Sequence, residues 1–387
     1  MSEPKASRDA EPKSPYLTTR WERLNGPQRI AGVDLARGLA VLGMFAAHLL
    51  WIDDPFDWGD PTTWAAVVHG RSSILFATLA GVSIGLLTGG TTPVSGDALR
   101  TARLRLVIRA CLLWLLGLVL IGTGVPVYVI LPAYAILFLL SLPFLGLVTS
   151  TVLILAGALA IVMPFVQVYL EALPVWSGSM GNDVSLALGW HYPFPVWIAF
   201  VLAGLGVARA GILRVRVQLW MVGAGLALAL TGYGLDAATG ADEKAERTSF
   251  WGAVWTARPH SSGLLEVIGS GGFALLVMGA CLLACRTVLT WVVLPIRAVG
   301  AMPLTAYTAQ LLVWAVIAAA VLGDTGDLRG FRDLEPFGPL VLWTILGCTA
   351  WALLVGRGPL EWAFDRAARL AVPARKDAAT RVGRVER

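Results

Sequence analysis

Four histidines are the side chains in this sequence best suited to moving a proton near neutral pH, and they are His48, His69, His191 and His260. His48 follows Arg37 by eleven residues within one apolar stretch. In a helix this separation is about three turns and about 16 Å, so both side chains project from one face. Asp34 precedes Arg37 by three residues and lies near that face.

Ionisable residues inside an apolar segment are costly and therefore indicate function. Arginine suits an anionic, phosphate-bearing ligand, which predicts a binding role for Arg37 together with Asp34. Histidine suits a general base, which predicts catalysis by His48. The competing interpretation is that Arg37 pairs with Asp34 and reaches the lipid headgroups.

Two further groups precede apolar stretches. In the run His69-Gly70-Arg71-Ser72-Ser73, we expect Ser72 or Ser73 to cap a helix whose start, beside Arg71, favours an anionic or oxyanionic group. His260 and Glu266 form the second group, interpreted as a proton relay. Alternatively, Glu266 is a hydrogen-bonded buried acid that only joins two helices.

The elements that position these residues follow from composition. Of the 387 residues, 57% are hydrophobic and 14% charged, against about 25% charged in soluble domains. A soluble enzyme and a nucleic-acid binder are therefore excluded, despite a formal net charge of +5. The sequence predicts an all-α integral membrane protein, a polytopic bundle of about ten, or ten to eleven, transmembrane helices.

Ten apolar windows are long enough to cross a bilayer. They cover residues 33–52, 72–88, 104–121, 125–147, 148–170, 194–211, 217–235, 263–285, 299–323 and 338–355. The shorter apolar run at 287–295 is interpreted as an interfacial or re-entrant segment, or as the start of an eleventh span.

The distribution of Lys and Arg predicts the orientation. With both termini in the cytoplasm, 24 of the 30 basic residues fall on the inner side. We therefore expect a multi-pass membrane protein with both termini in the cytoplasm. Its predicted parts are a disordered cytoplasmic tail at 1–29, a single membrane domain at 30–370 and a basic cytoplasmic tail at 371–387.

The four cysteines lie in apolar runs and are interpreted as small core residues, so no metal site is expected. The glycine-rich stretches at 81–85, 204–206 and 269–272 are interpreted as positions where helices approach closely. No dinucleotide-binding or phosphate-loop motif accompanies them.

Several of these segments resemble a known group of enzymes. Residues 33–40, with the spacing from Arg37 to His48, resemble the first catalytic helix of transmembrane acyltransferases, which include the acyltransferase-3 enzymes and the heparan-α-glucosaminide N-acetyltransferase catalytic domain. The run from His69 to Gly81 is similar to the second segment of bacterial members of the latter. The segments 300–310 and 356–362 resemble YeiB-like membrane proteins.

This resemblance implies transfer of an acetyl or other short acyl group from cytosolic acyl-CoA to a hydroxyl or amine of an extracytoplasmic cell-envelope glycan or glycolipid. It implies catalytic roles for His48 or His69, because the position near Asp60 that matches the family's reactive histidine holds no histidine. Arg37 would bind the CoA phosphates, and the protein would lie in the bacterial inner (plasma) membrane. From their residue types, we assign substrate binding to the remaining candidates, Asp34, Arg71, Ser72, His260 and Glu266.

The expected partners are membrane lipids, acyl-CoA and the envelope sugar, with no nucleic acid, and a homodimer is compatible with this architecture. The alternative function is a multi-pass permease for a small anion or a proton-coupled solute, in which Arg37, Asp34, His48 and Glu266 form the path.

Overall fold

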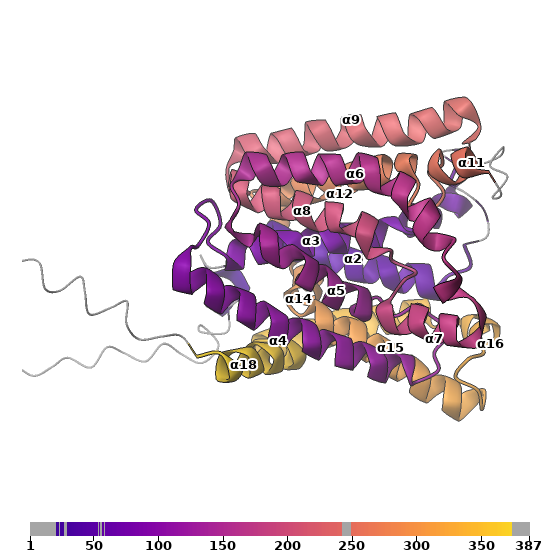
Figure 1. Cartoon of the computed structure of the whole chain (residues 1–387). Helices are drawn as coiled ribbons and strands as arrows, with labels where there is room; N and C mark the ends of the chain where they lie inside the picture. The colour runs from indigo at the N-terminus through magenta and orange to yellow at the C-terminus, as the bar shows by residue number, and fades with distance from the viewer. Residues whose placement is uncertain are drawn as a thin grey trace, which may run out of the picture.

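The computed structural model describes residues 21–373, apart from residues 23, 27–28, 53, 55, 58 and 242–248. Every regular element in this part of the chain is a helix. Figure 1 shows the long helices running side by side in one bundle. The predicted all-α fold is therefore confirmed, and the apolar character of these helices makes the chain a multi-pass membrane protein.

Within the described residues, eight helices are long and apolar enough to cross a membrane. They are α2 (Ala31–Leu49), the stretch Pro61–Leu87 that contains α3 (Arg71–Leu87), α4 (Gly96–Ile121), α6 (Thr149–Glu171), α9 (Val215–Thr239), α12 (Leu264–Ala284), α15 (Pro303–Val321) and α17 (Phe337–Leu354). Two predicted spans correspond to shorter apolar helices, α5 (Leu131–Ser141) and α8 (Phe194–Ala210). Each predicted window thus contains a helix, while the count of ten crossings stays a prediction.

Shorter elements connect the long helices. They are η1 (Pro61–Val68), η2 (Leu142–Gly146), η3 (Pro174–Trp176), α7 (Gly178–Leu188), α11 (Phe250–Val254), α13 (Leu289–Val292), α14 (Leu294–Ala301), α16 (Leu328–Asp333) and α18 (Pro359–Ala371). The short apolar run at 287–295 therefore forms α13 and the first residues of α14.

The helices differ in how much of their surface the protein covers. In α2, 72% of the apolar window is buried, against 11% in α17. The helix that carries Asp34, Arg37 and His48 is thus central, and α17 is peripheral. A central position removes these polar side chains from lipid, where an unpaired charge is costly.

Small residues allow the central helices to approach closely, as the sequence predicts. A Cβ atom added to Gly81 of α3 would lie 1.9 Å from the Val201 carbonyl oxygen of α8. A Cβ on Gly300 of α14 would lie 1.7 Å from the Asp34 carbonyl oxygen of α2. Glycine is therefore required at these two crossings.

The two ends of the bundle carry different elements. Figure 1 shows α18 at one end and α7, α11 and α16 at the opposite end, here called the α18 end and the α16 end. Leu24 is 2% exposed and its carbonyl accepts a hydrogen bond from Arg297, so residues near 24 belong to the bundle rather than to a tail ending at 29. The rest of the predicted tails, residues 1–20 and 374–387, lie outside the described residues.

Candidate functional site

The histidines come together at the α16 end of the bundle, although they belong to four separate segments. His48 lies in the last turn of α2, and His69, His191 and His260 precede α3, α8 and α12. The ring centroids of His69 and His260 are 5.4 Å apart, and those of His191 and His260 are 4.8 Å apart. The structure thus gathers three of the four histidine rings into direct contact.

His48 joins this group from the central helix. It is half-buried, and it lies close enough to His260 to contribute to the lowered pKa of that residue. The Arg332 side chain of α16 donates a hydrogen bond to the His48 carbonyl oxygen over 3.1 Å. The Nδ1 atoms of His48 and His260 are buried and have no hydrogen-bond partner among the described residues. Both rings are therefore available to a bound molecule.

The loop histidines are neutral at pH 7. Burial, with smaller effects from the neighbouring histidines, lowers the pKa of His260 to about 3. Burial, with His69 nearby, lowers the pKa of His191 to about 4. Burial and the Arg71 and Arg332 charges lower the pKa of His69 as well. All three rings are therefore in the neutral form, which is the form that can accept a proton.

Glu266 fixes the loop that carries His260. Its carboxylate accepts hydrogen bonds from the His260 backbone N–H (2.7 Å), the Ser262 backbone N–H (2.6 Å) and the Ser261 hydroxyl (3.1 Å). His260 and Ser262 have φ values of 62° and 54°, a left-handed conformation that is strained for these residues. The predicted proton relay between the two side chains is wrong, because Glu266 bonds the His260 backbone N–H and not the His260 ring.

Arg71 and Ser72 are both held inside the protein. The Arg71 Nε donates to the Tyr233 hydroxyl over 2.7 Å, and that hydroxyl shares a 2.7 Å hydrogen bond with Ser270. The predicted serine cap is wrong: Gly70, with φ of 71°, occupies the N-cap of α3, and no side chain caps it. Ser72 is instead the second residue of α3, past the N-cap, and is buried where α3 packs against Gly43 of α2.

Asp34 and Arg37 lie at the other end of α2, toward the α18 end. One Asp34 carboxylate oxygen is 3.2 Å from both the Arg29 and Arg37 guanidinium groups. Arg37 also donates to the Ser83 hydroxyl over 2.6 Å. The Asp34–Arg37 pair of the competing interpretation is therefore present, while the binding role of Arg37 stays a prediction. The second Asp34 oxygen has no hydrogen-bond partner among the described residues.

Sequence reasoning missed two partners of the histidine cluster. Arg332 lies 284 residues after His48 in the chain, and no local motif marks it. Tyr128 stacks on His191 with ring centroids 3.8 Å apart. Only the packing of α16 and of the loop before α5 against the ends of α2 and α8 brings these side chains together. In the described part of the chain, no group of three or more His, Cys, Asp or Glu residues is arranged to hold a metal ion.

The fold and this cluster define a multi-pass helical membrane protein with neutral imidazoles gathered at one end. The family described as heparan-alpha-glucosaminide N-acetyltransferase, catalytic, matches residues 29–234, which is more than half of the chain. The chain belongs to this family of acetyltransferase-like membrane enzymes.

The matched residues contain His48, His69 and His191, and they end within α9, before His260, Glu266 and Arg332. The resemblance predicted for the first two helices is confirmed, while the YeiB-like resemblance of the C-terminal segments stays a prediction. Comparison with curated proteins and with solved structures gives no match.

Proposed function

We propose that this protein transfers an acetyl or other short acyl group from cytosolic acyl-CoA to a hydroxyl or amine of an extracytoplasmic cell-envelope glycan or glycolipid. The observation that carries the proposal is the cluster of half-buried histidines at one end of a membrane bundle, in a chain of the acetyltransferase family. A bacterial inner membrane, with both termini in the cytoplasm, is part of this proposal.

The cluster supplies the base. The imidazole of His48 or His69 takes the proton of the acceptor hydroxyl or amine as the acceptor atom attacks the thioester carbonyl carbon. The carbon–sulfur bond then breaks, and the coenzyme A sulfur leaves with the proton that the imidazolium returns. Arg71 and the N–H groups at the start of α3 stabilise the oxyanion. In a second route the histidine is itself acylated before the acceptor reacts.

Arg37 supplies the second half of the site. Its distance from His48 along α2, about 16 Å, is a span that the pantetheine arm of acyl-CoA covers. Asp34 and Ser83 orient the Arg37 guanidinium, which binds the phosphates of the donor. We assign Ser72, His260 and Glu266 to the walls of the acceptor side, where Ser72 packs the start of α3 and Glu266 holds the His260 loop.

The test uses purified full-length protein in lipid nanodiscs with radiolabelled acetyl-CoA and isolated envelope glycans. We expect label transfer to the glycan, and its loss in a His48→Ala or a His69→Ala variant that keeps the wild-type melting temperature. Full activity in both variants would refute the mechanism. Solute counterflow in proteoliposomes without acyl-CoA would support the permease alternative instead.

A further inference from the structure

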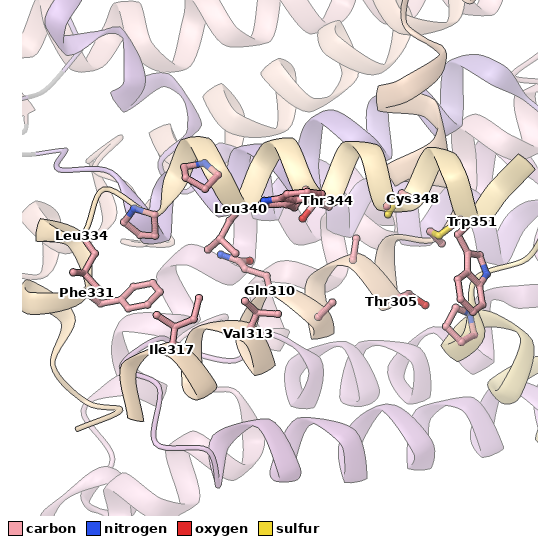
Figure 2. Close-up of a pocket in the computed structure, with 18 residues that line it drawn as sticks. Thr305, Gln310, Val313, Ile317, Phe331, Leu334, Leu340, Thr344, Cys348 and Trp351 are labelled. Atoms are coloured by element: carbon pink, nitrogen blue, oxygen red, sulfur yellow. The ribbon is translucent and has the colours of Figure 1, made fainter. Parts of the chain in front are cut away.

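A groove of about 790 Å³ lies between α15 and α17. Figure 2 shows the side chains of the two helices facing each other across it. None of the four histidines lines it, and its walls lie beyond the residues matched by the acetyltransferase family. Its volume is within the range of pockets that bind small molecules, so it is a second candidate site.

The walls of the groove change in polarity along its length. The half nearer the start of α15 carries the polar side chains of Thr305 and Thr344 and the Cys348 thiol, together with apolar side chains such as that of Trp351, and Gln310 lies in the middle. The half nearer α16 is lined by apolar side chains, including Val313, Ile317, Phe331 and Leu340. A ligand that matches both halves has a polar portion toward α18 and an apolar chain toward α16.

Gln310 is the polar group that most requires a ligand. Its side chain is 2% exposed, and neither its amide oxygen nor its amide nitrogen has a hydrogen-bond partner among the described residues. Figure 2 shows it between the two helices, in the middle of the groove. A buried unpaired amide is unfavourable, so a molecule with a hydrogen-bonding group at this position relieves an existing cost.

Positive charge lies near the α18 end of the groove, where Pro359 of α18 forms part of the wall. Asp365 of α18 contacts three guanidinium groups, those of Arg109, Arg357 and Arg369, at 2.8, 3.0 and 2.9 Å. The Trp351 indole, on the groove wall, donates to the Arg357 carbonyl oxygen over 2.9 Å. Glu361, which accepts hydrogen bonds from Thr305 on the groove wall, adds a second carboxylate at this end. Two carboxylates do not neutralise three arginines, so this end is complementary to a phosphate.

The outer side of the groove faces the bilayer. Trp343, which lines the groove, is 71% exposed, and Leu342 beside it is 55% exposed. Because α17 is peripheral, these side chains meet lipid hydrocarbon in a membrane. A molecule already in the bilayer therefore reaches the groove sideways, without crossing the helices.

We propose that the groove binds an anionic glycerophospholipid from the leaflet that borders α18. The phosphate lies among the arginines around Asp365, and an ester carbonyl accepts a hydrogen bond from the Gln310 amide. One acyl chain runs along the apolar half toward Phe331. This site is independent of the proposed acyl transfer, since it shares no residue with the histidine cluster.

Two glycines of α17 provide the test. A Cβ atom on Gly347, which lines the groove, or on Gly338, which does not, meets no atom within 4 Å. Gly347→Leu therefore fills the groove without a clash inside the protein, and Gly338→Leu is the matched control on the same helix. Gln310→Leu removes the hydrogen-bonding group and keeps the side-chain size.

Delipidated full-length protein in detergent is titrated with phosphatidylglycerol, phosphatidylcholine or palmitoyl-CoA, and bound molecules are counted by native mass spectrometry. We expect Gly347→Leu to weaken phosphatidylglycerol binding at least tenfold, Gln310→Leu several-fold and Gly338→Leu not at all, with phosphatidylcholine weaker in wild type. Melting temperatures verify that each variant is folded.

The proposal is overturned if Gly347→Leu binds phosphatidylglycerol as wild type does, or if the two phospholipids bind wild type equally, as annular lipid would. If palmitoyl-CoA displaces phosphatidylglycerol from wild type but no longer does so in Gly347→Leu, the groove binds an acyl-CoA. That result would also refute the phospholipid proposal. None of these measurements depends on acyl-transfer activity. A negative result for lipid binding would therefore not contradict the proposed acyltransferase function.

Discussion

Glu266→Gln tests whether the His260 loop is built for catalysis. The carboxylate accepts three hydrogen bonds, one through Oε1 and two through Oε2. A glutamine amide has one oxygen, so its NH₂ group faces a donor at His260 or at Ser262. The variant therefore loses one or two hydrogen bonds to a charged group, each contributing about 1.5–3 kcal/mol.

The same change releases backbone strain. His260 and Ser262 occupy left-handed conformations that cost of order 1–3 kcal/mol each and persist only while the surroundings enforce them. A net loss of about 3 kcal/mol lowers the ratio of closed to open loop roughly a hundredfold. We expect acyl-transfer kcat to fall at least tenfold, because the His260 ring leaves the cluster.

Glu361→Gln is the matched control for this prediction. Glu361 also accepts three hydrogen bonds, from the Leu304 and Thr305 backbone N–H groups and the Thr305 hydroxyl, but it lies at the α18 end. Label transfer from acetyl-CoA and thermal denaturation are measured for both variants. Equal losses of activity at equal melting temperatures, or full activity in Glu266→Gln, would refute the reasoning.

Three further predictions concern pH, packing and donor binding. The pKa values of His191 and His260 in the folded protein lie below the ordinary 6.5, so the unfolded chain binds more protons and the free energy of unfolding falls as the pH drops from about 6.5 toward 4. At pH 5 it should be about 2–4 kcal/mol lower than at pH 7.5. His260→Gln should remove about half of this difference, as measured by denaturation at the two pH values. Gly300→Ala places a methyl group against the Asp34 carbonyl and should lower stability by about 1–3 kcal/mol, unlike Gly223→Ala, whose new Cβ meets no atom within 4 Å. Arg37→Gln should raise KM for acyl-CoA at least tenfold with little change in kcat, and an unchanged KM would place the phosphates elsewhere.

Much of the architecture could be predicted from the sequence. Transfer of apolar side chains into lipid is nearly additive along a segment, so a window of residues carries the information that a helix crosses. Close helix contacts at Gly81 and Gly204 could also be predicted from local sequence, because only small residues allow two helix backbones to approach. The Arg37–Asp34 pair was predictable because three residues separate neighbours on a helix face.

The arrangement of the site depends on the tertiary structure. Arg332 meets His48 only because α16 packs against the end of α2, and Glu266 holds a backbone loop whose left-handed turns no periodicity predicts. The groove beside Gln310 exists because α15 and α17 diverge at the edge of the bundle. Local hydropathy determined which segments enter the membrane, whereas contacts between residues far apart in the chain depend on how the helices pack, and that packing placed the histidines together.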